Sequence, residues 1–201
     1  MKSLFTLLFF TCSVVACCQE NKSSVNFGLK LGFAMSTLSP NYTEDNGYKH
    51  QFNMSGGIRA GGYLQISAGK KLLFQPELLL VVKGANESPD NSNGYSYPAN
   101  GYPFRTSYIE IPLNLLVKLP TQSGFFTLGG GPAPAFAFNR YIYSGTAGFD
   151  MGLNFLLCYQ WPIGFSLNLN FTKGFSNVSP QAQGAPDLKN SSLGLSAGYT
   201  F

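Results

Sequence analysis

The chain has 201 residues, a length that one domain can use in full. Only 11% of the residues are charged, whereas 15% are aromatic, and the mean hydropathy is close to zero at +0.02. A chain that is poor in charge but not hydrophobic on average is expected to alternate apolar and polar residues rather than to contain apolar blocks. The formal charge of +4 is spread out without a cluster of Lys or Arg, which argues against a nucleic-acid-binding protein.

The segment 1–18 has the pattern of a secretory signal peptide. A positively charged start precedes an apolar run that continues to Ala16 and is too short to span a membrane. Small residues then fit cleavage after Cys18, which leaves 19–201 as the mature domain. The stretch "VVAC" is a second possibility, because it has the form of a loose lipobox that would make Cys17 a lipidated N-terminus.

Cysteine usage agrees with export and predicts neither a disulfide nor a metal site. Cys158 is the one cysteine that lies well inside the mature domain. A single thiol cannot form an internal disulfide, and no CxxC partner accompanies it. We therefore expect no metal and no cofactor, and we expect Cys158 to be a small wall-facing or buried side chain.

The mature domain consists of segments in which apolar and polar residues alternate with a period of two, the pattern of β-strands. In the first segment, Val25, Phe27 and Leu29 share one face, while Asn26 and Lys30 lie on the other. In chain order the segments are 25–36, 52–66, 71–84, 107–119, 125–138, 148–160, 164–175 and 191–201. No stretch after the signal reaches the ~18 apolar residues of a transmembrane helix.

The connections between these segments alternate between long and short. Long polar loops are expected at 39–51, 86–104, 139–146 and 177–190, and short turns at 67–70, 120–124 and 161–164. Eight strands of about ten residues, with tight turns at one end and long loops at the other, predict an all-β fold, an eight-stranded antiparallel up-and-down transmembrane β-barrel. In an exported chain the short-turn end, with both termini, faces the periplasm.

A soluble antiparallel sandwich is the alternative architecture, since its strands alternate too. Two observations disfavour it. The apolar faces continue for about ten residues, longer than the usual ~5–6 of globular strands. The opposite faces are rich in Gly, Ser and Asn, which suits a narrow lumen. Closure of the sheet would also pair every backbone polar group, as lipid requires.

The last segment ends on Phe201, with Tyr199 on the same face. In a closed barrel the last strand pairs with the first, so this end is held in the wall. A terminal aromatic residue also resembles the C-terminal signature that the outer-membrane barrel insertion machinery reads. We therefore expect that machinery to be a partner of the chain, through Tyr199 and Phe201.

Several stretches resemble the small outer-membrane β-barrel family described as porin-like or PorT-like. They are "GLKLGFAMSTL", "FQPELLLVVKG", "YIEIPLNLLVKL", "GFDMGLNF" and "GLSAGYTF". The resemblance covers about 25–201, and the "EIP" around Pro112 also matches it. The Gly129–Gly131 run with Pro132 and Pro134 departs from the family pattern, because Pro cannot donate to a strand ladder. PorT-like members imply a link to a protein-secretion or gliding apparatus.

Seven charged residues have the parity that points into the barrel. They are Lys30, Arg59, Glu77, Lys83, Glu110, Lys118 and Asp150. An eight-stranded interior is just wide enough for side chains to fill it, and an unpaired buried charge costs several kcal/mol. The near balance of signs therefore predicts a network of ion pairs that fills the lumen. The alternative is a narrow polar path for ions, with Arg59 and Glu77 at its constriction.

His50 is the single histidine, and it lies in the first long loop. Together with Ser88 or Asp90 it would imitate the rim site of a lipid-modifying outer-membrane enzyme. No G-x-S-x-G motif and no second histidine support that hypothesis. We therefore expect no catalytic, cofactor-binding or metal-binding residues.

The sequence thus predicts a non-catalytic protein of the bacterial outer membrane whose ion-paired barrel contacts membrane lipid and whose long loops contact a protein partner. Tyrosines are frequent in those loops and fit either partner contact or an interfacial aromatic belt. The alternatives are a narrow ion-conducting porin, a lipid-modifying outer-membrane enzyme and a lipidated periplasmic lipocalin-like binder.

Overall fold

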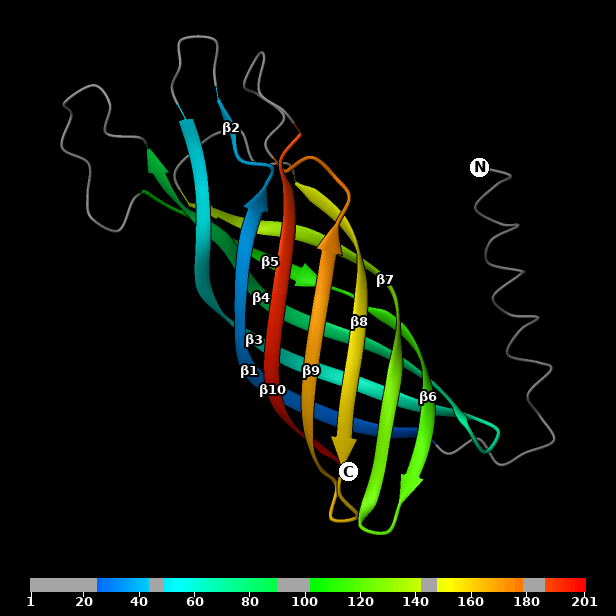
Figure 1. Cartoon of the computed structure of the whole chain (residues 1–201). Coiled ribbons are helices and arrows are strands. Elements are labelled where there is room, and N and C mark those ends of the chain that lie inside the picture. The colour runs from blue at the N-terminus through cyan, green and yellow to red at the C-terminus, as the bar shows by residue number, and fades with distance from the viewer. Residues whose placement is uncertain (1–24, 44–48, 90–101, 142–147, 179–186) are drawn as a thin grey trace, which may run out of the picture.

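The structure, a computed structural model, describes five ranges of the chain: 25–43, 49–89, 102–141, 148–178 and 187–201 (Figure 1). The predicted signal peptide and the central parts of the long loops lie outside these ranges. Within them, no helix is long and apolar enough to span a membrane.

All the strands in the described ranges belong to one antiparallel sheet (Figure 1). They are β1 (Val25–Ser39), β2 (Tyr42–Thr43), β3 (Lys49–Ala68), β4 (Leu72–Pro89), β5 (Tyr102–Glu110), β6 (Leu113–Thr121), β7 (Gly124–Tyr141), β8 (Phe149–Gln160), β9 (Phe165–Gly174) and β10 (Lys189–Thr200). The sheet closes on itself, since β1 pairs with β3 on one side and with β10 on the other. β2 is a short addition to β3, and β5 and β6 share one position between β4 and β7. The wall is therefore a ring of eight strands, which confirms the predicted barrel.

The predicted strand 107–119 is not continuous, because the ladder is interrupted at Pro112, between β5 and β6. Proline has no N–H to donate, so the break falls where the ladder would lose a bond. The wall nevertheless remains hydrogen-bonded there. The N–H of Ile111 donates to the carbonyl of Pro134 on β7 (2.8 Å), and the carbonyl of Pro112 accepts from the N–H of Glu77 on β4 (2.9 Å).

The irregular fifth segment forms one long strand, β7, despite its prolines. Pro132 and Pro134 lie opposite Leu153 and Met151 of β8 and remain in register. The glycines before them have a packing role. A Cβ atom at Gly131 would lie 1.8 Å from the carbonyl oxygen of Leu113, so only glycine allows β7 to approach β6 this closely.

Side chains on the two faces of the wall differ as the alternation predicts. On β1, large apolar residues from Val25 to Met35 are exposed on the outside, while Lys30, Ala34 and Ser36 are buried inside. Ten residues at about 3.4 Å each, tilted by about 40°, give an apolar height of about 26 Å, close to the ~25 Å band of transmembrane barrels. Other outward aromatic residues include Phe74, Phe126, Phe136, Phe138, Phe149, Phe155, Phe165, Phe171 and Phe175.

The three short turns lie together at one end of the barrel, as predicted, and the C-terminus lies at the same end (Figure 1). Gly69 and Gly164 adopt φ values of 76° and 89° in two of these turns, a region that glycine enters without steric cost. The strand ends that border the four long connections lie at the opposite end (Figure 1).

Aromatic side chains form an arc at the short-turn end. One row runs from Phe126 through Tyr159 to Trp161, with ring centroids 4.7 Å apart at each step. Phe201 stacks on Phe27 at 5.9 Å and contacts the edge of the Tyr199 ring at 5.1 Å, which joins the ends of β10 and β1. Such arrangements are typical of aromatic side chains at a membrane interface.

Candidate functional site in the barrel interior

The interior of the barrel holds six buried charged side chains in the part of the chain that the structure describes. Three are cations and three are carboxylates: Lys30, Arg59, Lys83, Glu77, Glu110 and Asp150. The numbers balance, so the buried charge sums to zero. Because each isolated buried charge costs several kcal/mol, this balance indicates an interior organised by ion pairs.

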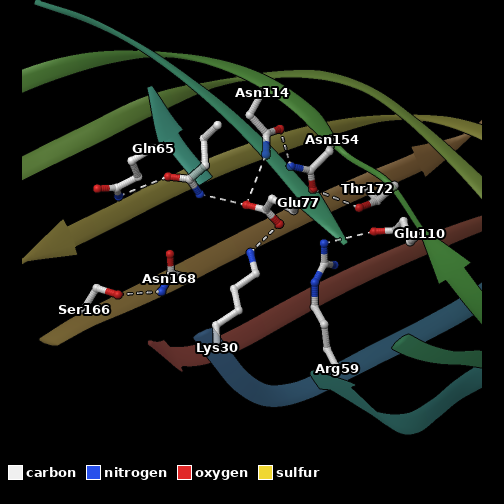
Figure 2. Close-up of polar contacts among 11 residues, drawn as sticks. Lys30, Arg59, Gln65, Glu77, Glu110, Asn114, Asn154, Ser166, Asn168 and Thr172 are labelled. Atoms are coloured by element: carbon white, nitrogen blue, oxygen red, sulfur yellow. Dashed lines mark hydrogen bonds and ion pairs between the residues drawn. The ribbon is translucent and has the colours of Figure 1, made fainter. Parts of the chain in front are cut away.

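Lys30 and Glu77 form the first ion pair, with 2.5 Å between Nζ and Oε2 and both side chains fully shielded (Figure 2). Lys30 lies on β1, and Glu77 lies on β4, beyond the neighbouring β3. Small residues give the lysine its space, since Gly61 and Gly198 flank it in register on either side. The lysine side chain can therefore cross its neighbouring strand to reach the carboxylate.

Glu110 on β5 is the second centre, because it binds two cations. Its Oε1 accepts a hydrogen bond from Nη2 of Arg59 at 2.9 Å (Figure 2), and its Oε2 pairs with Nζ of Lys83. The Lys83 ammonium also lies 5.6 Å from the ring centroid of Tyr108. Opposite Arg59 in register stands Gly32, so a large side chain again lies beside a small one. The cluster has one cation more than it has carboxylates.

A chain of side-chain amides joins the first ion pair to strands on several sides of the barrel (Figure 2). Gln65 donates to Gln160 at 3.0 Å and to Gln75 at 3.2 Å, and Gln75 donates to Oε1 of Glu77 at 2.8 Å. Beyond the carboxylate the chain continues as follows: Asn114 to Glu77 at 3.2 Å, Asn154 to Asn114 at 2.8 Å, and Thr172 to Asn154 at 3.1 Å. These contacts connect β3, β4, β6, β8 and β9 across the lumen.

Tyr63 fills the interior near the short-turn end. In register, Gly28 of β1 lies between Tyr63 of β3 and Thr200 of β10. The tyrosine ring lies over that glycine, and its hydroxyl hydrogen-bonds the Thr200 hydroxyl at 2.8 Å. The contact links β3 to β10 across the strand between them.

The two remaining predicted lumen charges lie apart from these ion pairs. Asp150 accepts a hydrogen bond from Asn190 at 3.0 Å and has no cation partner in the described part of the chain. Lys118 is only partly buried, and its ammonium lies 3.8 Å from the ring centroid of Phe125 near a short turn. Five of the seven predicted residues therefore take part in ion pairs, two around Glu77 and three around Glu110. The carboxylate of Asp150 balances the extra cation around Glu110 without touching it.

One stretch of the inner wall carries polar atoms that no protein group satisfies within the described ranges. Asn170, Ser192 and Ser196 are buried on β9 and β10, and neither the Asn170 amide nor the two hydroxyls have a hydrogen-bond partner there. Gly194 stands opposite Asn170 in register, next to the Arg59 side chain. This strip is polar, so it is the part of the interior best suited to water.

His50 lies at the loop end of β3, where the sequence suggested a rim site. Its Nδ1 pairs with the carboxylate of Glu87 on β4, and its ring stacks on Tyr42 with centroids 4.3 Å apart. The sequence did not suggest Glu87 as a partner of His50. The two residues lie near the loop ends of the paired strands β3 and β4, where Glu87 stands opposite Phe52. The Ser88 side chain and Asp90 lie outside the part of the chain that the structure describes.

Residues 18–179 match the family model of the outer membrane protein beta-barrel domain. The chain belongs to this family. It is a protein of the bacterial outer membrane, and its apolar outer face contacts lipid. The match is to the family as a whole, so membership of the PorT-like branch stays a prediction. No curated protein sequence matches the chain.

Solved structures share the barrel at low sequence identity. OprG from Pseudomonas aeruginosa is 14% identical, with a TM-score of 0.54 over 89% of this chain and 97% of that one. Ail, the attachment invasion locus protein of Yersinia pestis, was solved in complex with the heparin analogue sucrose octasulfate; it is 14% identical, with a TM-score of 0.48 over 89% of this chain and 99% of that one. Neisserial surface protein A is 12% identical, with the same TM-score and coverage as Ail. At such identities the likeness extends to the fold alone.

Proposed function

We propose that this outer-membrane barrel is a closed, non-catalytic anchor that displays its four long loops for contact with a protein partner. The observation that supports it is the ion-paired, hydrogen-bonded interior around Glu77 and Glu110. A solute that crossed the lumen would have to separate buried ion pairs, and breaking one such pair costs about 3–5 kcal/mol. Function is then left to the segments that project from the barrel.

Sequence supports the loops as the interacting part. Tyrosine, serine, glycine and asparagine are the residues that binding loops favour, because Tyr offers a large rigid surface and the others adapt their hydrogen bonds. The tyrosines in and next to the long loops are Tyr42, Tyr48, Tyr95, Tyr97, Tyr102, Tyr141 and Tyr143. The strand ends that border the long connections lie opposite the short turns, and long connections of outer-membrane barrels face the cell exterior. The resemblance to PorT-like proteins adds a secretion apparatus as the source of the partner.

Planar-bilayer recording tests whether the barrel is closed. The wild-type protein is expected to give no steady steps of ion current. The double variant Arg59→Ala with Glu110→Ala removes two large side chains from the ion-paired interior and is expected to conduct. Steady steps from the wild type that disappear when Arg59 alone is changed would show a channel and contradict the closed anchor.

Cross-linking in cells, followed by detergent extraction and co-purification, tests the loops. A variant in which 90–101 is replaced by a short Gly-Ser linker keeps the described strands and removes one loop. The partner is expected to co-purify with the wild type and much less with the loop variant. Equal recovery with every single-loop variant would remove the loops as the interacting surface.

A narrow polar path is the second candidate function, and the strip of Asn170, Ser192 and Ser196 favours it. Their unsatisfied polar atoms line one side of the interior, where water-sized species would find hydrogen-bond partners. Replacing Asn170 by Leu separates the candidates. A small conductance that this substitution abolishes would establish the path, and the closed anchor predicts no conductance with either residue.

The absence of catalysis is tested at His50, the only histidine of the chain. Its imidazole contacts Glu87, an arrangement that also occurs in general-base sites. We expect the His50→Ala variant to leave the lipid composition of the outer membrane unchanged relative to the wild type. A lipid modification that appears with the wild type and is lost in this variant would make the protein an enzyme.

A further inference from the structure

A groove of about 390 Å³ lies on the outside of the barrel wall, away from the filled interior. Apolar side chains form most of its lining, and one cation, Arg105, stands at its border: the lining residues are Phe33, Ala34, Met35, Gly56, Gly57, Ile58, Val82 and Arg105. The volume falls within the range of about 300–1,000 Å³ that is usual for small-molecule sites.

A β-bulge and two glycines create the groove. The register between β3 and β4 shifts by one residue between Met54 and Arg59, and such a bulge bends the strand locally. Both glycines fall inside that shift. Gly56 pairs with the outward Met35 and leaves no side chain on the outer surface, whereas Gly57 pairs with the inward Ala34 and lies close to β4. A Cβ atom at Gly57 would lie 2.1 Å from the carbonyl oxygen of Val82, whereas one at Gly56 would meet nothing within 4 Å. Gly56 thus faces open space in the groove.

Arg105 gives the groove a charged border on the loop side of the wall. It lies on β5, opposite Gly84 of β4, and its side chain is exposed. In the part of the chain that the structure describes, no ion pair joins it to a carboxylate. A guanidinium beside an apolar groove suits a ligand that combines an anionic group with a hydrocarbon chain.

The distribution of charge over the described strands points to the same ligand class. Their carboxylates Glu77, Glu110 and Asp150 are buried in the interior, and Glu87 pairs with His50. On the outward faces near the loop end stand cations instead: Arg105, Lys173 and Lys189. Asp187, which precedes β10, accepts a hydrogen bond from Asn177. Asp187 keeps its charge, so among the described residues at this end three outward cations face one exposed carboxylate, an excess that attracts anionic headgroups.

We propose that this groove is a binding site for a phosphorylated, acylated lipid of the outer leaflet. One acyl chain lies in the groove against Phe33, Met35 and Ile58, over the gap at Gly56, and a phosphate of the headgroup accepts hydrogen bonds from Arg105. The site differs from general contact with the bilayer because it holds one lipid at a defined place. It is independent of any partner that the loops bind.

Native mass spectrometry of the full chain in detergent, with bisphosphorylated lipid A as the added lipid, tests the site. Two variants address its two halves: Arg105→Gln removes the charge at similar length, and Gly56→Leu fills the groove without a backbone clash. Lys70→Gln is the matched control, because Lys70 is an exposed cation in a short turn at the other end. A heat-dependent shift in gel mobility first verifies that each variant is folded.

The wild type and Lys70→Gln are expected to retain one lipid A molecule. Arg105→Gln is expected to bind it about ten-fold more weakly, as for the loss of one charge-assisted hydrogen bond. Gly56→Leu is expected to weaken both lipid A and its dephosphorylated form, while Arg105→Gln affects only the phosphorylated one. Retention by both variants at the wild-type level would overturn the proposal. Displacement of the lipid by millimolar inorganic phosphate would also overturn it, because the site would then recognise the phosphate group and not the acyl chain.

Discussion

At the scale of single residues, Glu110 is the side chain whose loss leaves the most charge uncompensated. It is fully buried and binds both Arg59 and Lys83. Replacing it by Gln keeps the shape but leaves two buried cations without a carboxylate. We expect the free energy of unfolding to fall by about 3 kcal/mol or more. Urea titration of the protein in lipid vesicles, followed by gel mobility, measures this change.

Lys83→Met is the matched control for Glu110→Gln. It leaves the neutral pair of Arg59 and Glu110 in place, so only one cation is lost and none is stranded. Its cost is therefore expected to be smaller than that of Glu110→Gln. If Glu110→Gln were as stable as the wild type, the interior would not depend on ion pairs.

The Tyr63 ring packs over Gly28, and a double-mutant cycle measures how far the two residues depend on each other. A Cβ atom at Gly28 would lie 2.3 Å from the tyrosine ring. Gly28→Ala is therefore expected to destabilise the barrel more than Tyr63→Phe, which keeps the ring and removes only the hydroxyl that bonds Thr200, a contact worth about 1 kcal/mol. With Tyr63→Leu already present, the cost of Gly28→Ala should shrink, because the ring that it displaces is gone. Additive costs would show that the ring does not depend on the glycine.

At the scale of strands, the close approach of β6 and β7 depends on glycine. Gly131→Ala would place its Cβ atom 1.8 Å from the Leu113 carbonyl oxygen, so the two strands would have to separate and their ladder would weaken. We expect a large loss of folded protein, seen as loss of the heat-modifiable gel species. Gly56→Ala is the control, since its Cβ atom meets no atom within 4 Å. Equal folding of the two variants would contradict a tight β6–β7 contact.

The strands and their inward faces could be predicted because a period of two is a local property of the sequence. Alternation placed Lys30, Glu77 and Glu110 inside, and the structure buries all three. The interruption at Pro112 was harder to predict, because the carbonyl and N–H groups that satisfy it belong to β4 and β7. A local pattern shows that proline weakens a ladder but does not show which distant strands compensate.

The partners within the interior could not be predicted for the same physical reason. Lys30 reaches Glu77 two strands away, a pairing that depends on how far the strands are staggered around the barrel. By parity alone Lys118 was expected to join the ion pairs of the interior. It lies next to a short turn instead, where its ammonium contacts the ring of Phe125. The amides of Gln65 and Asn114 also have inward parity, and the same criterion applied to uncharged side chains would have found them.

At the scale of the whole molecule, two layers with different chemistry share each strand. The inner layer is mostly polar, with two small apolar clusters around Leu116 and Leu79. The buried charges of the described residues sum to zero, and the polar contacts cross the barrel from one strand to distant ones. The outer layer is apolar and ends in an aromatic arc at the short-turn end. The inner contacts hold the wall closed, and the outer residues fix its depth in the membrane. Such a barrel would suit the anchor role that we propose.

Closure of this molecule takes place where β10 meets β1, and Phe201 lies at that seam. Its N–H donates to the carbonyl of Phe27 at 2.8 Å, and its ring contacts those of Phe27 and Tyr199. Phe201→Ala keeps the backbone bond but removes the aromatic contacts and the terminal aromatic that the insertion machinery is expected to read. We expect the folded fraction in outer-membrane preparations to fall several-fold, with slower appearance of the heat-modifiable species after a pulse of synthesis.

Phe175→Ala is the control for Phe201→Ala, because Phe175 is also an outward aromatic residue but lies at the loop end, just after β9. Refolding of both variants into lipid vesicles without the insertion machinery distinguishes two causes. If the machinery reads Phe201, the two purified variants refold alike and differ only in cells. If Phe201 acts through the seam itself, its variant also refolds more slowly in vesicles. Equal assembly of both variants in cells would show that the terminal aromatic has neither role.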